Sequence, residues 1–99
     1  MIEIGDFFMD LTAIGEILID LTQIGVNEYD VPLFAANPGG APANVAVAAS
    51  RLGIQTAFIG KVGGDAFGAY LRSVLTNDGV DCSGLRKDSR PTTMAVVSV

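Results

Sequence analysis

Apolar and polar residues follow one another along this chain in blocks that predict alternating strands and helices. The first long apolar block, Leu11 to Leu21, is rich in Ile and Leu and lacks helix-capping residues, so it predicts a buried strand that continues past Gly15. Residues 22–30 are polar and predict a loop, and the short apolar block Val31 to Asn37 predicts a second strand.

Two helices are predicted in the middle of the chain. Small residues from Pro42 to Leu52 follow a Gly-Gly pair and precede Gly53, which suits a helix with proline in its first turn and glycine after its end. Asp65 is a good N-cap for a second helix from Ala66 to Asn77. The apolar face of this second helix is made by Phe67, Leu71, Val74 and Leu75.

Three more apolar blocks predict strands, over Gln55–Val62, Val80–Leu85 and Thr92–Val99. Strands and helices that alternate in this way predict an α/β fold with right-handed crossovers. The segment 22–37 is too long for a minimal connection, and we interpret it as part of a lid.

Composition narrows the classes of function. The 99 residues carry a net charge of −5, with no Lys or Arg among the first fifty, so the chain has no electrostatic attraction to nucleic acid or to an anionic membrane. With no His and a single Cys82, a Ser-His-Asp triad, a His-ligated metal site and an internal disulfide are excluded within it. No apolar run spans a bilayer and the start lacks a basic signal region, so we expect a soluble, cytoplasmic protein.

The segment around Gly39-Gly40 is the first candidate for a binding site. A glycine pair before a helix leaves the first helical amides unscreened, and such amides bind hydroxyl or anionic oxygens. Asn44 adds an amide in the first turn, and Asp20 ends an apolar block. The residues alone leave other interpretations open: a plain turn at Gly39-Gly40, a capping role for Asn44 and a solvated strand end at Asp20.

A second glycine-rich segment, Gly60 to Asp65, does not give the Gly-x-Gly-x-x-Gly spacing of a dinucleotide site. We interpret Gly63-Gly64-Asp65 as a turn and a helix cap, and Lys61 as a solvated strand lysine. The sequence also has no P-loop.

The spacing of glycines with Asn and Asp resembles the first signature of a known family. The matching positions are Gly39-Gly40-x-x-x-Asn44-x-Ala46, Arg51-Leu52-Gly53, Gly60, Gly63-x-Asp65 and Gly68, with Ala13 to Asp20 upstream and Asp78-Gly79-Val80-Asp81 and Pro91-Thr92-Thr93 downstream. They resemble the ribokinase-like (PfkB) carbohydrate kinases from about Leu11 to Val99, and Pro42 to Ala46 is similar to the fructokinase branch. Residues 1–10 do not match the family's start.

The resemblance implies both a fold and a role. It implies that residues 1–99 form the N-terminal part of a three-layer αβα sandwich with a small β lid, with lid segments near 22–37 and 80–99. Asp20, Gly39, Gly40 and Asn44 would bind a sugar, one of whose hydroxyls attacks the γ-phosphate of MgATP. Family members also use K⁺ and form homodimers through the lid.

Two departures from the family pattern limit the activity and the substrate that we expect of this chain. The C-terminal Gly-Ala-Gly-Asp signature is absent, so the chain alone would lack the catalytic base and the sites for ATP, Mg²⁺ and K⁺. Ala41 stands where ribokinases carry a lysine, which argues against ribose. We therefore expect the sugar-binding part of a fructokinase. The alternatives are a family kinase acting on 2-keto-3-deoxygluconate, ribose or a nucleoside, or a non-catalytic sugar-binding module.

Overall fold

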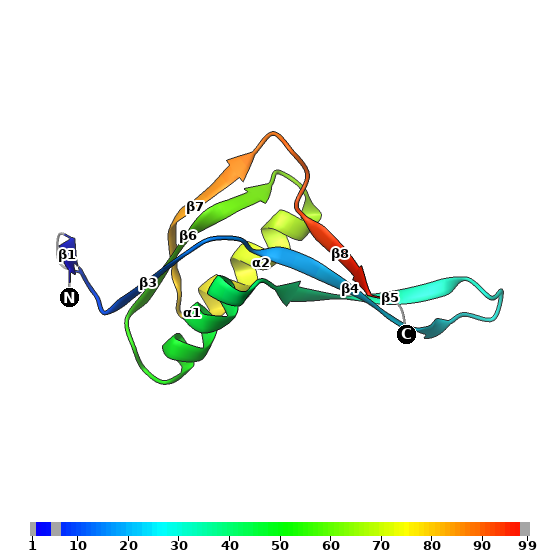
Figure 1. Ribbon diagram of the computed structural model, residues 1–99, viewed down its shortest axis with the longest axis horizontal. Helices are drawn as coiled ribbons and strands as arrows, with labels where there is room; N and C mark the ends of the chain where they lie inside the picture. Colours follow the sequence, from blue (N-terminus) through cyan, green and yellow to red (C-terminus); the bar gives the residue numbers. More distant parts are fainter. Residues whose placement is uncertain (1, 5–6, 98–99) are drawn as a thin grey trace.

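The computed structural model describes residues 2–4 and 7–97, with side chains from Met9 to Val97. The molecule is elongated, 55 × 31 × 18 Å along its principal axes (Figure 1). It contains two three-stranded sheets and a short N-terminal hairpin of β1 (Ile2–Ile4) and β2 (Phe7–Met9). The hairpin and the tip of the second sheet lie at opposite ends of the long axis (Figure 1).

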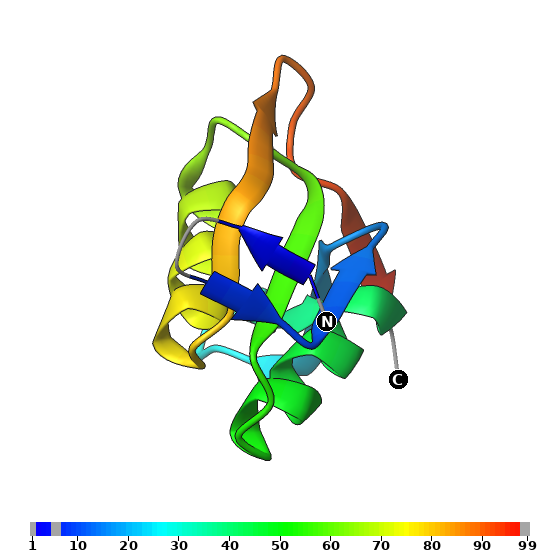
Figure 2. The same ribbon diagram turned by 90° about the vertical axis from the view of Figure 1, so that its left-hand side faces the viewer.

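The first sheet, which we call the core sheet, is parallel. It orders β3 (Leu11–Ile14), β6 (Thr56–Gly63) and β7 (Asp81–Asp88) as β3-β6-β7. The helices α1 (Ala41–Arg51) and α2 (Ala66–Asn77) cover one face of it: α1 contacts β3 and β6, and α2 contacts β6 and β7 (Figure 2). This is the α/β fold expected from the alternation of elements.

The hydrophobic core lies between these helices and the sheets. Its most buried large side chains include Phe58, Ile19, Leu71 and Leu75, and burying one such side chain contributes about 1.5–3 kcal/mol. Three residues of the predicted apolar face of α2 are confirmed, since Leu71 and Leu75 are buried and Phe67 packs against the same cluster, while Val74 is half-buried and lies outside that cluster. Neither helix in the described part of the chain is long and apolar enough to cross a membrane.

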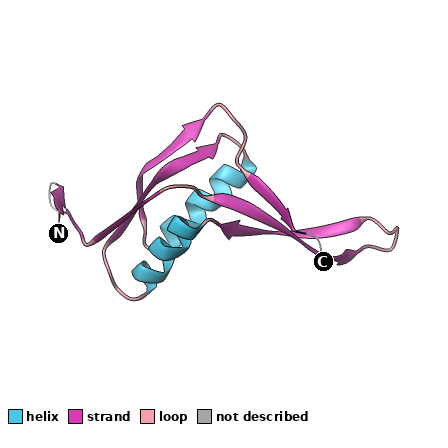
Figure 3. Cartoon of the chain, viewed as in Figure 1, coloured by secondary structure: helices cyan, strands magenta, loops and turns pink. Residues whose placement is uncertain are grey.

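The second sheet is mixed and carries the candidate site. It orders β5 (Pro32–Gly39), β4 (Leu18–Val26) and β8 (Met94–Val97), with β4 antiparallel to β5 and parallel to β8. The β4–β5 hairpin extends away from the helices (Figure 3). The predicted lid segments were 22–37 and 80–99. Residues 22–26, 32–37 and 94–97 lie in this sheet, whereas β7 lies in the core sheet and residues 98–99 lie outside the described part of the chain.

The prediction of a single strand over Leu11 to Leu21 is wrong. The first strand ends before Gly15, and the chain then passes from the core sheet to the second sheet. Gly15 has φ +154°, and a Cβ there would lie 2.7 Å from the Pro42 Cγ, so a side chain fits neither the backbone nor the space. The predicted loop over 22–30 is also shorter than expected, since β4 continues to Val26. The turn begins at Asn27, whose Oδ1 accepts hydrogen bonds from the Tyr29 and Val31 amides at 2.8 and 3.1 Å.

Candidate functional site

The start of α1 is built from backbone, as the Gly-Gly pair predicts. Gly40 is the N-cap residue with φ +102°, and it provides no side-chain hydrogen bond to cap the helix. A Cβ on Gly40 would lie 2.7 Å from the Glu16 carbonyl oxygen and 3.2 Å from the Ile17 Cα. Only glycine therefore allows the start of α1 to pack this closely against the segment that joins the two sheets. No side chain of the cap residue occupies the first amides of α1.

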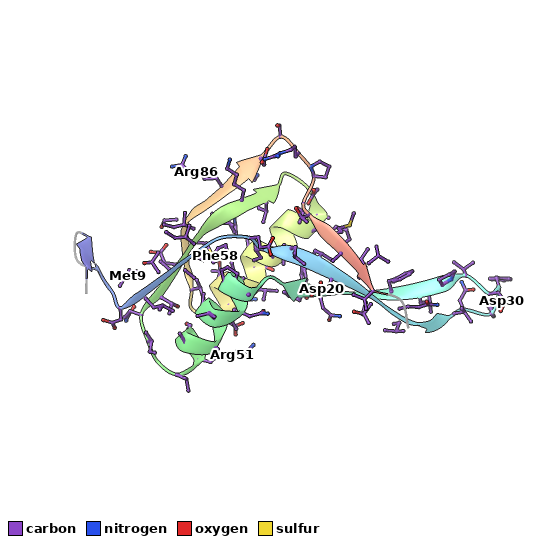
Figure 4. The ribbon with its side chains drawn as sticks, in the orientation of Figure 1. Met9, Asp20, Asp30, Arg51, Phe58 and Arg86 are labelled. Carbon is purple, nitrogen blue, oxygen red and sulfur yellow. The ribbon has the colours of Figure 1, made fainter. Side chains whose placement is uncertain are left out.

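Asp20 lies on β4 beside the end of β5. Its neighbour Leu18 pairs with Gly39 across the two strands, and Asp20 itself pairs with Asn37. A side chain on Gly39 would collide with the Asp20 carboxylate, so the carboxylate lies directly over the Gly39 backbone. Asp20 is half-buried, and Figure 4 labels it near the middle of the molecule.

Asn44 lies in the first turn of α1, four residues after the cap. Its backbone N–H donates to the Gly40 oxygen at 3.0 Å, and its side chain is exposed. The structure therefore places Asp20 against Gly39, and Gly39, Gly40 and Asn44 follow one another at one helix start. The arrangement brings together carboxylate acceptors, the backbone of a helix start and a side-chain amide.

A cavity of about 430 Å³ opens at the carboxyl ends of the core-sheet strands. It is lined by Gly15–Ile17, by the end of β6 from Lys61 to Gly63, by Asp88 at the end of β7, and by Arg90–Thr93 after it. None of the four predicted site residues is among the lining residues. The cavity and the candidate site nevertheless share a wall, because the segment that lines the cavity at Glu16 and Ile17 is the one that Gly40 contacts.

The charged side chains at this cavity include an ion pair. Arg90 Nη2 lies 2.8 Å from Asp88 Oδ2, and hydrogen bonds from Arg90 hold the Asp88 pKa far below its usual range. The same contact raises the pKa of Arg90. Lys61 is exposed, as expected for a solvated strand lysine, and lines the cavity. We did not single out Asp88 or Arg90 from the sequence; the signal that points to them is their place at and just after the carboxyl end of a parallel strand.

Asp65 caps α2, as predicted, and its Oδ1 accepts a hydrogen bond from the Gly68 amide at 2.8 Å. It also accepts hydrogen bonds from Thr92, which together with the Gly68 bond hold its pKa below the ordinary value. Thr92 is thus a buried partner that the cap pattern did not reveal.

The described residues contain no group of three or more His, Cys, Asp or Glu side chains that could hold a metal ion, and the sequence has no P-loop.

Comparison with known proteins gives a consistent result. The family described as pfkB family carbohydrate kinase matches residues 9–99. Over 88 residues the chain is 49% identical to a sugar kinase of Pyrococcus horikoshii described as uncharacterized, and this alignment covers 89% of the chain and 26% of that protein. The crystal structure of that protein superimposes with a TM-score of 0.80 over 90% of this chain and 31% of the other.

Fructokinases are similar as well. Fructokinase-1 of Zea mays is 53% identical over 60 residues, which is 61% of this chain and 19% of that protein. A Vibrio cholerae fructokinase solved with fructose, ADP and calcium ion is 40% identical, with a TM-score of 0.72 over 88% of this chain and 27% of the other. The chain therefore spans about a third or less of each of these relatives.

Proposed function

Because this chain belongs to the pfkB family of carbohydrate kinases, we propose that it forms the sugar-binding part of a kinase that phosphorylates fructose. The observation that carries the proposal is the placement of the Asp20 carboxylate over Gly39, immediately before a helix that has no side-chain cap. The substrate follows from the similarity to fructokinases, and from the fructose named with one of the similar structures.

Each of the four site residues has a role that its chemistry supports. The two oxygens of Asp20 accept hydrogen bonds from adjacent sugar hydroxyls, which suits a vicinal diol. Amides at Gly39 and Gly40 donate to sugar oxygens, and the Asn44 side chain both donates and accepts. Neutral hydroxyls also suit a region whose sequence carries acids and no bases up to Ser50.

The second sheet serves as the lid in this proposal. Asp20 lies on β4, so a movement of the β4–β5 hairpin carries a binding residue with it. Closure of such a sheet over a sugar excludes water, which otherwise competes as the phosphoryl acceptor.

In kinases ATP supplies the phosphoryl group, and bound Mg²⁺ neutralises the charge that develops on it. The Gly-Ala-Gly-Asp signature that carries the catalytic base in this family is absent from the sequence, so we assign no phosphoryl-transfer step to the described residues. Their part in the reaction is to bind and orient the sugar.

Fructose binding by the 99-residue protein tests the proposal. Saturation-transfer NMR with fructose should give a signal that Asp20→Asn abolishes. Asp30→Asn is the matched control, because it removes the same charge at the tip of the β4–β5 hairpin, at a residue with φ 59° where Asn is tolerated (Figure 4). An Asp20→Asn protein that binds fructose as well as the Asp30→Asn protein does would contradict the role of Asp20.

The same measurement separates the substrates. Ribose, 2-keto-3-deoxygluconate and a nucleoside are titrated beside fructose, and fructose should give the strongest signal. A stronger signal from another of these ligands would move the proposal to that substrate, while a wild-type protein that binds none of them would contradict the sugar-binding role itself.

A further inference from the structure

A group of hydrogen bonds around Thr92 joins α2 to the segment between β7 and β8. Asp65 Oδ2 accepts from the Thr92 amide at 2.9 Å, and Asp65 Oδ1 accepts from the Thr92 hydroxyl at 2.6 Å. The same hydroxyl oxygen accepts from the Gly63 amide at 2.9 Å. Thr92 is only 4% exposed, so its bond from Gly63 is buried, whereas its bonds to the exposed Asp65 are partly buried. We call Gly63, Asp65, Gly68 and Thr92 the Thr92 clasp.

The residues of the Thr92 clasp are also closely packed. A Cβ on Gly63 would collide with the Thr92 amide, and it would lie 2.5 Å from Asp65 Oδ2. A Cβ on Gly68 would collide with the Gly63 carbonyl oxygen and lie 3.2 Å from the Thr92 hydroxyl. The backbone of Thr92 is therefore fixed relative to β6 and α2 both by hydrogen bonds and by contact.

The clasp is more than a helix cap requires. An N-cap needs one side-chain acceptor for an amide two or three residues on, and Asp65 meets this need through Gly68. The bonds to Thr92 involve both carboxylate oxygens. Oδ2 accepts from the Thr92 amide, and Oδ1 accepts from the Thr92 hydroxyl in addition to the Gly68 amide. A serine at position 65 would cap the helix equally well, but its single short hydroxyl would not replace the carboxylate's bonds to Thr92.

The clasp is joined to the candidate sugar site through one residue. Thr93 follows Thr92 directly, and its carbonyl oxygen accepts from the Ile19 amide at 2.9 Å. From there the pairing continues along β8, where Met94 pairs with Ile19 and Ala95 pairs with Asp20. The backbone that carries Asp20 is thus connected to the core sheet through Thr93 and Thr92.

We propose that Asp65 is a positioning residue for the sugar site, which acts through Thr92 to hold the strand that carries Asp20. Asp65 itself touches no substrate. The effect on sugar binding rests on the proposed function, whereas the effect on the position of β4 does not.

Hydrogen exchange read by mass spectrometry tests the connection in the 99-residue protein. Asp65→Ser keeps the cap and removes the bonds to Thr92, Thr92→Val removes the hydroxyl and keeps the branched shape, and Thr92→Ser keeps the hydroxyl. In the first two variants the segment around Ile19 should exchange about tenfold faster or more, as expected for losing a hydrogen bond to a charged group. The segment around Leu71 in α2 should change much less, and Thr92→Ser should restore protection.

Equal loss of protection at Ile19 and Leu71 would overturn the proposal, because the clasp would then support the whole fold and not this strand. Unchanged protection at Ile19 in both variants would overturn it as well. In a second measurement, Asp65→Ser should weaken fructose binding at least severalfold, and unchanged affinity would refute the effect on the sugar site. If the wild-type protein binds no sugar, the proposed function fails, while the exchange result still decides whether the clasp holds β4.

Discussion

Gly39 and Asp20 lie close together in the candidate site. Gly39 is buried, and the Asp20 carboxylate lies where its side chain would be. Gly39→Ala should therefore displace the carboxylate and weaken fructose binding. Gly64→Ala is the control, because a Cβ at exposed Gly64 meets nothing within 4 Å. Fructose titration measures the effect, and equal affinity of the two variants would argue against the contact.

The acidic residues predict how stability depends on pH. The pKa values of Asp65, Asp81 and Asp88 are all lowered from the ordinary 3.8, by hydrogen bonds from Thr92, Ser83 and Arg90 respectively. A carboxyl with a lowered pKa in the folded state stabilises the protein above the unfolded-state value, and this contribution is lost as the pH falls through the folded-state value. The free energy of unfolding should therefore be steady near neutral pH and decline below about pH 4.

Removing one of these hydrogen bonds tests the cause of the decline. Thr92→Val deprives Asp65 of the hydroxyl that is the largest cause of its lowered pKa. The variant should lose less stability between neutral pH and pH 3 than the wild type does, as measured by thermal unfolding across that range. A decline as steep as in the wild type would mean that Asp65 contributes little to it.

At the scale of elements, the two helices end against each other. The Ser50 hydroxyl donates to the Asp78 carbonyl oxygen at 2.5 Å, and Arg51 pairs with the Asp78 carboxylate through two bonds of 3.2 Å. A glycine in the left-handed region follows each helix, Gly53 with φ +86° and Gly79 with φ +84°. These glycines end the helices, as the sequence predicts.

The two helix ends differ in how much room surrounds the glycine. A Cβ at Gly53 meets nothing within 4 Å, whereas a Cβ at Gly79 would lie 3.0 Å from the Ser50 Oγ. Gly53→Ala should cost about 1–2 kcal/mol from backbone strain alone, and Gly79→Ala should cost more because it also crowds that contact. Chemical denaturation of both variants makes the comparison, and a Gly79→Ala protein no less stable than Gly53→Ala would refute the crowding.

How well the sequence predicted each element depended on whether its signal is local. The cap at Asp65 and the bounds of α2 are determined by neighbouring residues and were correct. The break at Gly15 was missed, because what demands a glycine there is Pro42, which is close only in the fold. Gly39, Gly40 and Asn44 lie close together in the sequence, so their grouping could be predicted from it. The contact of Asp20 with Gly39 depends on the register of β4 and β5, which the sequence does not reveal locally.

At the scale of the whole molecule, the helices cover one face of the core sheet, and apolar side chains on both sheets remain exposed. Parallel sheets are normally covered on both faces, yet Ile14 and Ile59 on the core sheet are 70% and 42% exposed. On the second sheet, Val96 of β8 is 65% exposed. The chain spans about a quarter of its Pyrococcus horikoshii relative, so a longer protein of this family has ample chain to cover these surfaces.

For the 99 residues alone, these surfaces predict self-association. In the described part of the chain β8 pairs only with β4, so its other edge offers unpaired backbone groups beside exposed apolar side chains. Sedimentation velocity should show a mass that rises with concentration, and Val96→Lys should shift the protein towards monomer, because a charge on an edge strand opposes pairing. Asn77→Lys is the matched control, since it adds the same charge at an exposed position of α2, remote in sequence from β8. A wild-type protein that stays monomeric at all concentrations would contradict the prediction, and equal effects of the two lysines would show that net charge, and not the β8 edge, governs association.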